Sequence, residues 1–457
     1  MGAEQSAYPR SCVVVGGGLA GLAAACALAD RGWQVTLLEK RRWLGGRASS
    51  FLDPLLQHPV DLGQHVFMRC FTAYLDFLKR LGVYHKVFIQ SRLQVPIVDA
   101  HTGIRGVLFS QPWLPSPLHL LRGFVAYPHL MPSEKARAMR GMLTAWRTDR
   151  RGAERSLESG TFQEWLLRQS QTPRIIQRLW EPIILATLNA LPSQVSATAG
   201  LMVVQEALLA GPHTADIGWA TVPLSPLVEE AVKRYLAERG GRVLTGVAVA
   251  GLMWNGDQVE SVVLVDGQRV WGRVFVLAVP WDTLLHLLNS GWAEHPFFVP
   301  LRRLRGVPIL NIHLWYDRPV MREPFVGFLN SSVQWVFNKT ALWGLEGPGQ
   351  YISITVSGAQ EYVGVPQEQV LQTFGREMQR LFPEAGLAHL VHARAVVIRQ
   401  ATFCPSPGVE ALRPPHQTPI SNLFLAGDWT RTGWPSTMEG AVRSGLLAAQ
   451  AVVRSFP

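Results

Sequence analysis

The sequence has little cysteine, and it lacks the apolar runs of a membrane-spanning helix. Its 457 residues include only four cysteines, Cys12, Cys26, Cys70 and Cys404, and no two of them have the close spacing of a metal-binding pair. This excludes a cysteine-based metal site and a disulfide framework, and it suits a reducing compartment. The apolar stretch Cys12–Ala29 has the pattern of a nucleotide-binding strand, turn and helix, and no other stretch offers about 18 uninterrupted apolar residues, so we expect no membrane-spanning helix. Residues 1–10 lack the apolar core of a signal peptide, so we expect none.

Long runs of basic charge are also missing. Lys and Arg (43) outnumber Asp and Glu (33), which gives a net charge of +10, but no basic run exceeds Lys40–Arg42. Aromatic residues are not interleaved with the basic ones, so we expect no nucleic-acid partner. Attraction to an anionic membrane surface is a better functional explanation of this charge than a nucleic-acid partner. The hydrophobic content of 48% and the length indicate a globular protein of two or three domains.

A dinucleotide-binding pattern opens the chain. Ser11–Val15 is a short β-branched run typical of a buried strand, and Leu19–Ala29 and Gln34–Glu39 have the composition of a helix and a second strand. Three glycines between the first strand and the helix have G-x-G-x-x-G spacing: Gly16, Gly18 and Gly21. They suit a tight turn, close approach to a pyrophosphate and close helix packing, respectively. Glu39 is placed to accept from adenosine ribose hydroxyls, and an acid there disfavours NADP.

The rest of the chain divides into segments with different patterns of apolar and polar residues. Residues 1–80, 215–290 and 416–457 have α/β patterning and are predicted to form one discontinuous cofactor-binding domain. Residues 81–214 are predicted to be a mainly helical insertion over the substrate. Residues 291–415 carry several alternating runs and are predicted to form an antiparallel sheet. The expected fold class is α/β, with a Rossmann-like domain and an inserted substrate domain.

A second glycine pair, Gly45-Gly46, follows Glu39 and precedes Arg47. Binding of NAD does not need it, but a second chain crossing over the same pyrophosphate does, with Arg47 as a charged donor. This pattern resembles the flavin-containing amine oxidase and carotenoid desaturase superfamily. Three later blocks resemble the same superfamily in the same order: Val60–Phe67, Thr245–Leu252 and Leu423–Gly445. The resemblance implies FAD as the cofactor and an amine-oxidase-like fold.

The resemblance also implies a role for each block. Val60–Phe67 supplies the turn beneath the isoalloxazine, and the backbone of Val247 brackets the adenine. Asp428 accepts from the ribityl hydroxyls, and Met438 and Glu439 present backbone N–H groups to flavin N1 and O2. The predicted cofactor-binding residues are Gly16, Gly18, Leu19, Ala20, Gly21, Glu39, Lys40, Gly46, Arg47, Gly63, Gln64, His65, Val247, Gly427, Asp428, Trp434, Met438 and Glu439.

Motifs in the insertions resemble one branch of the superfamily, the hydroxysqualene dehydroxylases of bacterial hopanoid pathways. These motifs are Thr161–Gln169, Leu179–Asn189, Asn311–Val320 and Ser331–Lys339. The resemblance implies that the hydroxyl of the long isoprenoid alcohol hydroxysqualene is replaced by hydrogen, which gives squalene. Reduced flavin supplies the hydride in an apolar tunnel that excludes water. Since the chain has one dinucleotide fingerprint, a separate electron donor must reduce the FAD.

Two residues are candidates for the general acid that assists loss of hydroxide. His65 lies in the turn expected near the flavin, although a packing or capping role fits that position better. Glu181 is an acid in an otherwise apolar run, and it could also pair with Arg178. Asp61 resembles a structural turn acid. Three aromatic residues could line the tunnel or the core: Trp180, Trp335 and Phe337.

Three alternatives remain open at the level of the sequence. The first is a carotenoid-type desaturase, which the flavin blocks do not exclude. The second is a flavin amine oxidase, which usually needs an aromatic pair and a lysine-linked water at the flavin. Lys339 is not placed to suggest such a lysine, and the stretch 432–440 near the C-terminus offers a single aromatic residue, Trp434. The third is a flavin-bearing membrane-associated interaction protein without turnover.

The isoprenoid substrate would have to come from lipid. We therefore expect a bacterial cytoplasmic protein that is peripherally associated with the inner face of the cytoplasmic membrane. Residues 113–131 combine apolar side chains, prolines and Arg122, which is the composition of an interfacial anchor. The same stretch could instead form a buried lid over the flavin.

Overall fold

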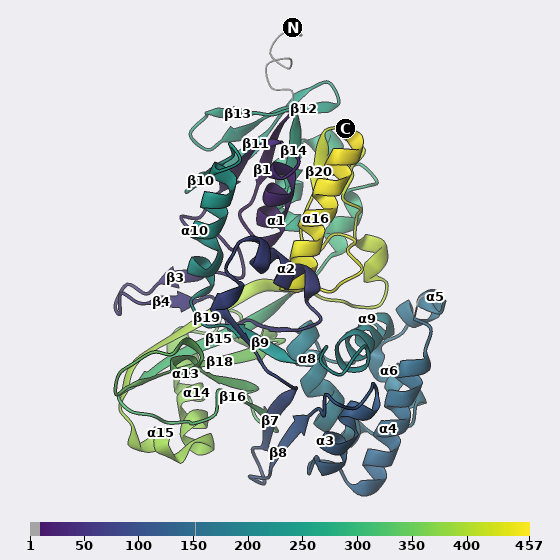
Figure 1. The fold of residues 1–457 in the computed structure, drawn as a ribbon, viewed down its shortest axis with the longest axis vertical. Helices are drawn as coiled ribbons and strands as arrows, with labels where there is room; N and C mark the ends of the chain where they lie inside the picture. The colour runs from purple at the N-terminus through teal and green to yellow at the C-terminus, as the bar shows by residue number, and fades with distance from the viewer. Residues whose placement is uncertain (1–9, 151) are drawn as a thin grey trace.

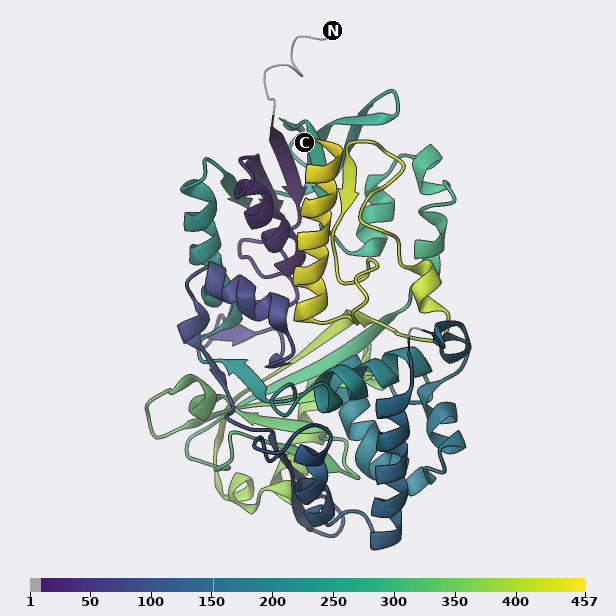
Figure 2. The same ribbon diagram turned by 45° about the vertical axis from the view of Figure 1, so that its right-hand side comes forward.

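The computed structural model describes residues 10–150 and 152–457 (Figure 1). The first nine residues of the predicted cofactor-binding segment 1–80 therefore lie outside the described residues, as does residue 151 of the segment 81–214. Cofactor-binding and substrate-side parts occupy opposite ends of the molecule, with long strands between them (Figures 1 and 2). No helix within the described ranges is both long enough and apolar enough to cross a membrane.

A five-stranded parallel sheet forms the centre of the cofactor-binding end. In spatial order its strands are β10 (Arg242–Thr245), β2 (Gln34–Glu39), β1 (Ser11–Val15), β14 (Val274–Leu277) and β20 (Leu423–Leu425). One face is covered by α1 (Leu19–Ala29), α2 (Thr72–Arg80), α10 (Leu224–Ala237) and α16 (Met438–Ser455). The other face packs on β11 (Val249–Asn255), β12 (Gln258–Leu264), β13 (Arg269–Trp271) and α11 (Trp281–Leu287). β1, α1 and β2 have the predicted bounds.

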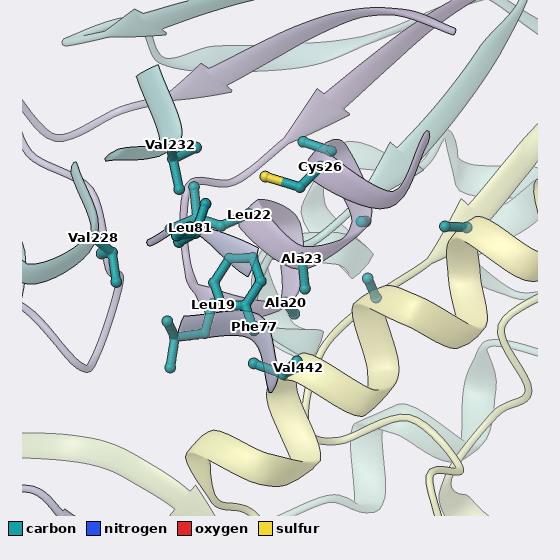
Figure 3. Packing of buried hydrophobic residues seen from close by; sticks show 14 of the residues in the cluster. Leu19, Ala20, Leu22, Ala23, Cys26, Phe77, Leu81, Val228, Val232 and Val442 are labelled. Carbon is teal, nitrogen blue, oxygen red and sulfur yellow. The ribbon is translucent and has the colours of Figure 1, made fainter. Parts of the chain in front are cut away.

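Helices α1 and α16 pack at very close range beneath this sheet (Figure 3). A Cβ added to Gly445 of α16 would lie 2.1 Å from the Ala20 carbonyl oxygen of α1, so only glycine permits this approach. Ala20 and Ala23 of α1 and Val442 of α16 are buried at this contact. The C-terminal helix is thereby held against the first helix of the chain.

A seven-stranded sheet spans the substrate-side half. Its order is β19 (Leu390–Phe403), β15 (Gly306–Tyr316), β18 (Gln350–Ser357), β17 (Trp335–Asn338), β16 (Phe325–Leu329), β7 (Gln94–Asp99) and β8 (Arg105–Phe109). Its pairs are antiparallel except β16 with β7, which run parallel. α14 (Gln367–Leu381) and α15 (Pro383–Leu387) cover one face. The alternating runs between residues 291 and 415 therefore form the predicted antiparallel strands.

The segment 81–214 differs from its predicted helical character at its start. Residues 87–109 form β6 (Val87–Ile89), β7 and β8, and the last two extend the large sheet. Helical structure begins only with the 3-10 turn η3 (Leu118–Leu120). The elements that follow are α3 (Leu121–Ala126), α4 (Pro132–Arg147), α5 (Glu154–Glu158), α6 (Phe162–Arg168), α7 (Pro173–Ile175), η4 (Ile176–Trp180), α8 (Glu181–Leu188), α9 (Ala197–Met202) and η5 (Val203–Leu209).

A small three-stranded sheet joins the two halves. β9 (Ile217–Ala220) lies between β5 (Val66–Met68) and β6. Phe67 on β5 packs into the cofactor-side core, whereas Trp219 on β9 packs into the core of the helical segment. The remaining short elements are β3 (Ser50–Leu52), β4 (Pro59–Asp61), α12 (Ser290–Ala293), α13 (Lys339–Trp343) and the 3-10 turns η2 (Tyr84–Lys86), η6 (Val299–Arg303), η7 (Gln360–Tyr362) and η8 (Val409–Leu412).

Candidate functional site

The turn between β1 and α1 contains two glycines that the protein's own packing requires, and a third, Gly18, that it does not require. Gly16 has φ +109°, and a Cβ there would lie 2.4 Å from the Ala278 carbonyl oxygen. A Cβ on Gly21 would lie 1.9 Å from the Gly16 oxygen, so the protein's own packing requires glycine at both positions. At Gly18 the nearest atom is 3.8 Å away, the Cα of Gly46. A side chain at Gly18 would therefore meet only ordinary contact with the protein, so the protein's own packing does not require glycine at this helix start.

The second glycine pair lies directly against this turn. The Gly45 N–H donates to the Gly17 carbonyl at 2.9 Å, and Gly45 pairs with Gly18 as an isolated β-bridge. A Cβ on Gly46 would lie 2.8 Å from the Gly18 Cα. Two glycine turns from different segments thus meet where α1 begins, as the predicted double crossing over a pyrophosphate requires. Leu19 and Ala20, the first residues of α1, are buried.

The Glu39 carboxylate lies at the end of β2 and is buried. Its two oxygens accept the backbone N–H groups of Gly17 at 2.7 Å and Arg41 at 2.8 Å. The Val247 N–H donates to the Glu39 carbonyl at 2.9 Å, so the two predicted adenosine-binding residues are neighbours. Lys40, also predicted to bind the cofactor, has an exposed side chain.

Arg47 and Asp428 bring the early and late cofactor motifs together. The Arg47 guanidinium forms a salt bridge to one oxygen of the buried Asp428 carboxylate, and the Ser436 hydroxyl donates to the other oxygen. Arg47 also donates to the Ala401 carbonyl at 2.7 Å. Gly427, just before Asp428, has φ +153° and donates its N–H to the Ser444 hydroxyl of α16 at 2.7 Å. Contacts with Arg47 from the early motif and with Ser436 and Ser444 from the late motif thus hold Gly427 and Asp428 in place.

The N-terminus of α16 presents free donors. Thr437 caps the helix and takes the N–H groups of Gly440 and Ala441. The N–H groups of Met438 and Glu439 have no acceptor within the described part of the chain, so they stay available to a ligand. A helix N-terminus with unpaired N–H groups favours an electron-rich partner, such as the pyrimidine end of a flavin.

The Glu439 side chain has a structural role at the same place. Its buried carboxylate accepts the backbone N–H groups of Ala73 at 3.1 Å and Tyr74 at 2.8 Å, in the first turn of α2. Arg443 donates to it at 2.6 Å. Trp434, another predicted cofactor residue, is buried and lies 4.3 Å from the Arg443 guanidinium, ring centroid to carbon. The side chains around the start of α16 are therefore held by the protein itself.

The turn after β4 carries a buried lysine contact that sequence analysis missed. Lys339 of α13 donates to Asp61 at 2.9 Å and to the Gln64 side-chain oxygen at 2.8 Å. Burial lowers the pKa of Lys339, and the neighbouring Asp61 carboxylate opposes that shift. From the sequence, Lys339 was not expected to supply the lysine of an amine oxidase; the structure places it at this turn, because its partners lie in a distant segment. Asp61 also accepts from the Leu224 N–H at 3.0 Å, as a structural turn acid does.

The His65 ring lies at the same turn but is poorly suited to act as an acid. Its Nδ1 lies 2.9 Å from the Gly63 carbonyl oxygen, so Nδ1 carries the proton. Burial lowers the pKa of His65, which keeps the ring neutral near pH 7. A neutral ring with this tautomer can accept a proton at Nε2 but holds none there to donate. His65 therefore stays a predicted cofactor-binding residue, and it is poorly suited to be the general acid.

The large sheet presents buried polar side chains to this turn. Asn311 on β15 lies so close to Gly63 that a Cβ there would be 2.6 Å from its Nδ2. That Nδ2 is buried without a hydrogen-bond partner. Two positions further along β15, the Nδ1 of His313 forms a hydrogen bond with the Tyr351 hydroxyl at 2.8 Å. Burial lowers the pKa of His313 to about 3. The only sequence signal for this pair was polar residues alternating within the apolar run Ile309–Tyr316.

Glu181 lies away from these residues, in a groove between α8 and the β16–β17 hairpin. The groove has a volume of about 250 Å³, and Ile97, Leu185 and Trp335 also line it. Burial raises the pKa of Glu181 above its ordinary value. The suggested pairing with Arg178 does not occur, because Arg178 binds Asp99 at 2.8 Å. The structure does not bring Glu181 into contact with the cofactor-binding group.

The three predicted tunnel aromatics divide between cavity and core. Trp335 lines the groove of Glu181, whereas Phe337 is buried in the core beneath the helical segment. Trp180 is fully buried and donates to the Gln171 side-chain oxygen at 3.1 Å. Among the described residues no group of three or more His, Cys, Asp or Glu is arranged to hold a metal ion.

A larger cavity of about 820 Å³ shares Ile97 with the groove of Glu181. Its apolar lining is aromatic and aliphatic: Phe88, Ile97, Val107, Phe109, Trp219 and Phe325. The volume is in the range of small-molecule sites. Trp219 pairs with Val66 on β5, the residue directly after His65. The cavity wall is therefore one β-strand away from the turn expected under the flavin.

Comparisons with known proteins agree with this architecture. A family model described as "Flavin containing amine oxidoreductase" matches residues 19–453. A 15-cis-phytoene desaturase of Synechococcus elongatus is 27% identical over 458 residues, which cover 96% of this chain and 95% of that protein. A zeta-carotene desaturase of Arabidopsis thaliana is 26% identical over 484 residues and covers 95% of this chain and 84% of its own length.

Solved structures share the fold at low identity. An oxidoreductase from Methanosarcina mazei aligns with a TM-score of 0.73 and 15% identity, covering 97% of this chain and 100% of its own. A cyclohexylamine oxidase from Brevibacterium oxydans aligns with a TM-score of 0.66 and 17% identity, covering 98% and 99%. The predicted α/β, amine-oxidase-like fold class is thus confirmed.

Proposed function

The chain belongs to the flavin-containing amine oxidoreductase family, and from this premise we propose that it reduces hydroxysqualene to squalene. It is an oxidoreductase, and its cofactor is FAD. The residues at the site suit this cofactor: a glycine at position 18 that the protein's own packing does not require, a guanidinium–carboxylate pair at Arg47 and Asp428, and a free N–H group at Met438. Reduced FAD supplies a hydride.

The Glu181 carboxyl is the observation that carries the dehydroxylation. Loss of an allylic hydroxyl needs a proton donor, because hydroxide is a poor leaving group. Burial raises the pKa of Glu181 with no basic partner to oppose it, so the protonated form persists to higher pH. The groove of Glu181 shares Ile97 with the larger apolar cavity. A long substrate in that cavity could extend its polar part toward an acid.

The protein, its FAD and the substrate supply every group that the reaction needs, except for the electron source. The substrate C–O bond breaks, one proton from Glu181 leaves with the hydroxyl as water, and one hydride forms the new C–H bond. A two-electron donor outside this chain must then reduce the FAD again. The aromatic wall of the cavity around Trp219 and Phe325 would shield the allylic cation from water once a long substrate fills the cavity.

Desaturation of a carotenoid-type polyene is the second candidate. It is favoured by the 27% identity to the Synechococcus elongatus phytoene desaturase over nearly the whole of both chains. The same cavity suits a hydrocarbon polyene. Such a reaction removes hydrogen from the substrate and has no leaving hydroxyl, so it needs no proton from Glu181.

An anaerobic flavin experiment separates the two candidates. The purified holoprotein is reduced with just enough dithionite, and hydroxysqualene or phytoene is added. Return of the oxidised-flavin absorbance with hydroxysqualene, together with squalene as the product, supports the proposal. Bleaching of the oxidised holoprotein by phytoene, with no response of the reduced form to hydroxysqualene, supports desaturation and overturns it.

A further inference from the structure

The helices α3 and α4 carry an exposed apolar surface that the cofactor site does not use. On α4, Met139, Leu143 and Trp146 are exposed by 39%, 39% and 47%. These positions recur at intervals of four and three residues, so they form one stripe along the helix. The opposite face of α4 is buried through the small residues Ala138 and Ala145. Apolar side chains on the outward face therefore serve no folding purpose that the structure shows.

The stripe on α4 continues onto α3. Lys135 lies one turn before Met139 on the same face, and its ammonium donates to the Val125 carbonyl at the end of α3. Val125 and Leu121 of α3 are exposed by 55% and 44%. The two helices also lie side by side at the lower end of the molecule (Figure 1). We call this continuous set Leu121, Val125, Met139, Leu143 and Trp146 the α3–α4 surface.

Basic residues surround the α3–α4 surface. Arg122, Arg137, Arg140 and Arg147 are all exposed. The one acid between Leu121 and Arg147 is Glu134, which binds Arg174 at 2.8 Å. The local charge is therefore positive, and an apolar stripe flanked by arginines is the composition of a helix that lies in the headgroup region of an anionic bilayer.

The α3–α4 surface adjoins the mouth of the apolar cavity. α3 packs directly on β8, where a Cβ on Gly123 would lie 2.0 Å from the Phe109 carbonyl oxygen. Ala126 at the end of α3 and Pro128 line the 820 Å³ cavity. Phe88, another lining residue, is itself exposed by 46%. The cavity thus opens beside the exposed side chains of α3.

We propose that the α3–α4 surface docks the protein on an anionic lipid bilayer and places the cavity mouth against the lipid. The surface was expected within residues 113–131. In that stretch Trp113, Leu118, Leu121, Val125 and Met131 are exposed, whereas Phe124 and Tyr127 are buried, and α4 adds further exposed apolar side chains. Docking itself does not depend on the reaction. Transfer of a long isoprenoid from lipid into the cavity rests on the proposed function.

The test uses holoprotein and sedimentation with two vesicle types. One is pure phosphatidylcholine, and the other contains about one-third phosphatidylglycerol. Wild-type protein is expected to sediment with the anionic vesicles and to be released by high salt. A Met139→Ser/Leu143→Ser/Trp146→Ser variant should lose this binding. Since each basic residue near such a surface contributes about 1 kcal/mol, an Arg140→Glu/Arg147→Glu variant should bind at least about thirtyfold more weakly.

Matched controls keep the result interpretable. Leu387→Ser/Val391→Ser removes apolar side chains that are exposed by 78% and 57% elsewhere on the molecule. Arg31→Glu/Arg269→Glu reverses two exposed arginines on the cofactor-binding part. All variants must retain FAD and the wild-type unfolding midpoint. The proposal is overturned if wild-type protein stays in the supernatant, or if the controls lose binding as strongly as the α3–α4 variants.

A second arm separates docking from catalysis. Hydroxysqualene is supplied either within the anionic vesicles or in detergent micelles. The α3–α4 variants should turn over the vesicle-borne substrate much more slowly than wild-type protein but match it in micelles. Equal rates in vesicles overturn the delivery role. Absence of turnover by wild-type protein in micelles counts against the proposed function and leaves the binding result standing.

Discussion

Lys339 and Asp61 form a buried ion pair, with 2.9 Å between Nζ and Oδ2, although 278 positions of the chain separate them. The pair ties the helix after β17 to the turn expected beneath the flavin. Lys339 also lies 3.8 Å from the centre of the Trp343 ring, and Gln64 accepts its other hydrogen bond. The large sheet is therefore fastened to the cofactor-binding half by a charged contact rather than by apolar packing alone.

Breaking this pair should destabilise the protein strongly. We expect Lys339→Met to lower the free energy of unfolding by roughly 3–5 kcal/mol, because Asp61 is left as a buried charge without its cation. Urea unfolding at a fixed, saturating FAD concentration measures the change. The double variant Asp61→Asn/Lys339→Met should recover part of the loss. Strictly additive effects of the two substitutions would show that the two groups do not interact.

Gly18 and Gly21 should respond differently to the same substitution. Gly18→Val places its side chain in space with no protein atom nearer than 3.8 Å to the Cβ, so the protein should fold but lose FAD. Gly21→Val puts a Cβ 1.9 Å from a backbone oxygen and should fail to fold. Flavin absorbance after gel filtration and circular dichroism report the two outcomes. A folded Gly18→Val protein that keeps stoichiometric FAD would contradict the placement of the pyrophosphate.

Asp428→Ala should weaken FAD binding by about 1.5–3 kcal/mol, the value of a hydrogen bond to a charged group. The substitution removes an acceptor for the ribityl hydroxyls and also leaves Arg47 without its carboxylate. Titration of the apoprotein with FAD, followed by flavin fluorescence, gives the affinity. Asp257→Ala, at an exposed turn, is the matched control. Equal FAD affinities of the two variants would mean that Asp428 only orders its own turn.

The raised pKa of Glu181 predicts how activity depends on pH. The protonated acid is lost as pH rises through this raised pKa, so kcat/KM for hydroxysqualene should fall on the alkaline side. Glu181→Gln should be slow and should lack this descending limb. Glu346→Gln, at an exposed position, should keep the wild-type profile. An unchanged limb in Glu181→Gln would assign the acid to another residue.

The same shift also predicts a change in stability. Between the ordinary and the raised pKa of Glu181, the folded protein binds more protons than the unfolded chain. The free energy of unfolding should therefore decrease as pH rises through that window. Glu181→Gln should remove this contribution, whereas Glu346→Gln should not. Urea unfolding at several pH values is a readout that does not need substrate.

The cofactor-binding turn could be predicted from sequence because its determinants are local. β1, α1 and β2 begin and end at the predicted residues, since a β-branched run, three spaced glycines and an alanine-rich helix specify them within thirty residues. The strands β15 and β18 were also predicted, because their apolar and polar residues alternate over long stretches.

Contacts between distant segments were not predictable in the same way. The strand β7 contains Pro96 and was assigned to a helical segment, yet it pairs in parallel with β16, more than two hundred residues later. Sequence analysis did not place Lys339 at the turn expected beneath the flavin, because no residue near it in sequence explains a buried cation. Its partners Asp61 and Gln64 become neighbours only when the two halves of the molecule meet.

The strand order of the five-stranded sheet dictates when FAD can be captured during synthesis. β1 and β2 leave the ribosome early, but β14 and β20 complete their sheet only after residues 274–277 and 423–425 have emerged. The free N–H groups of α16 and the Asp428 partner of Arg47 appear later still. Until then the buried face of α1 lacks α16, so a nascent chain exposes apolar surface for most of its translation. Cofactor binding is thus a late step that follows closure of the chain upon itself.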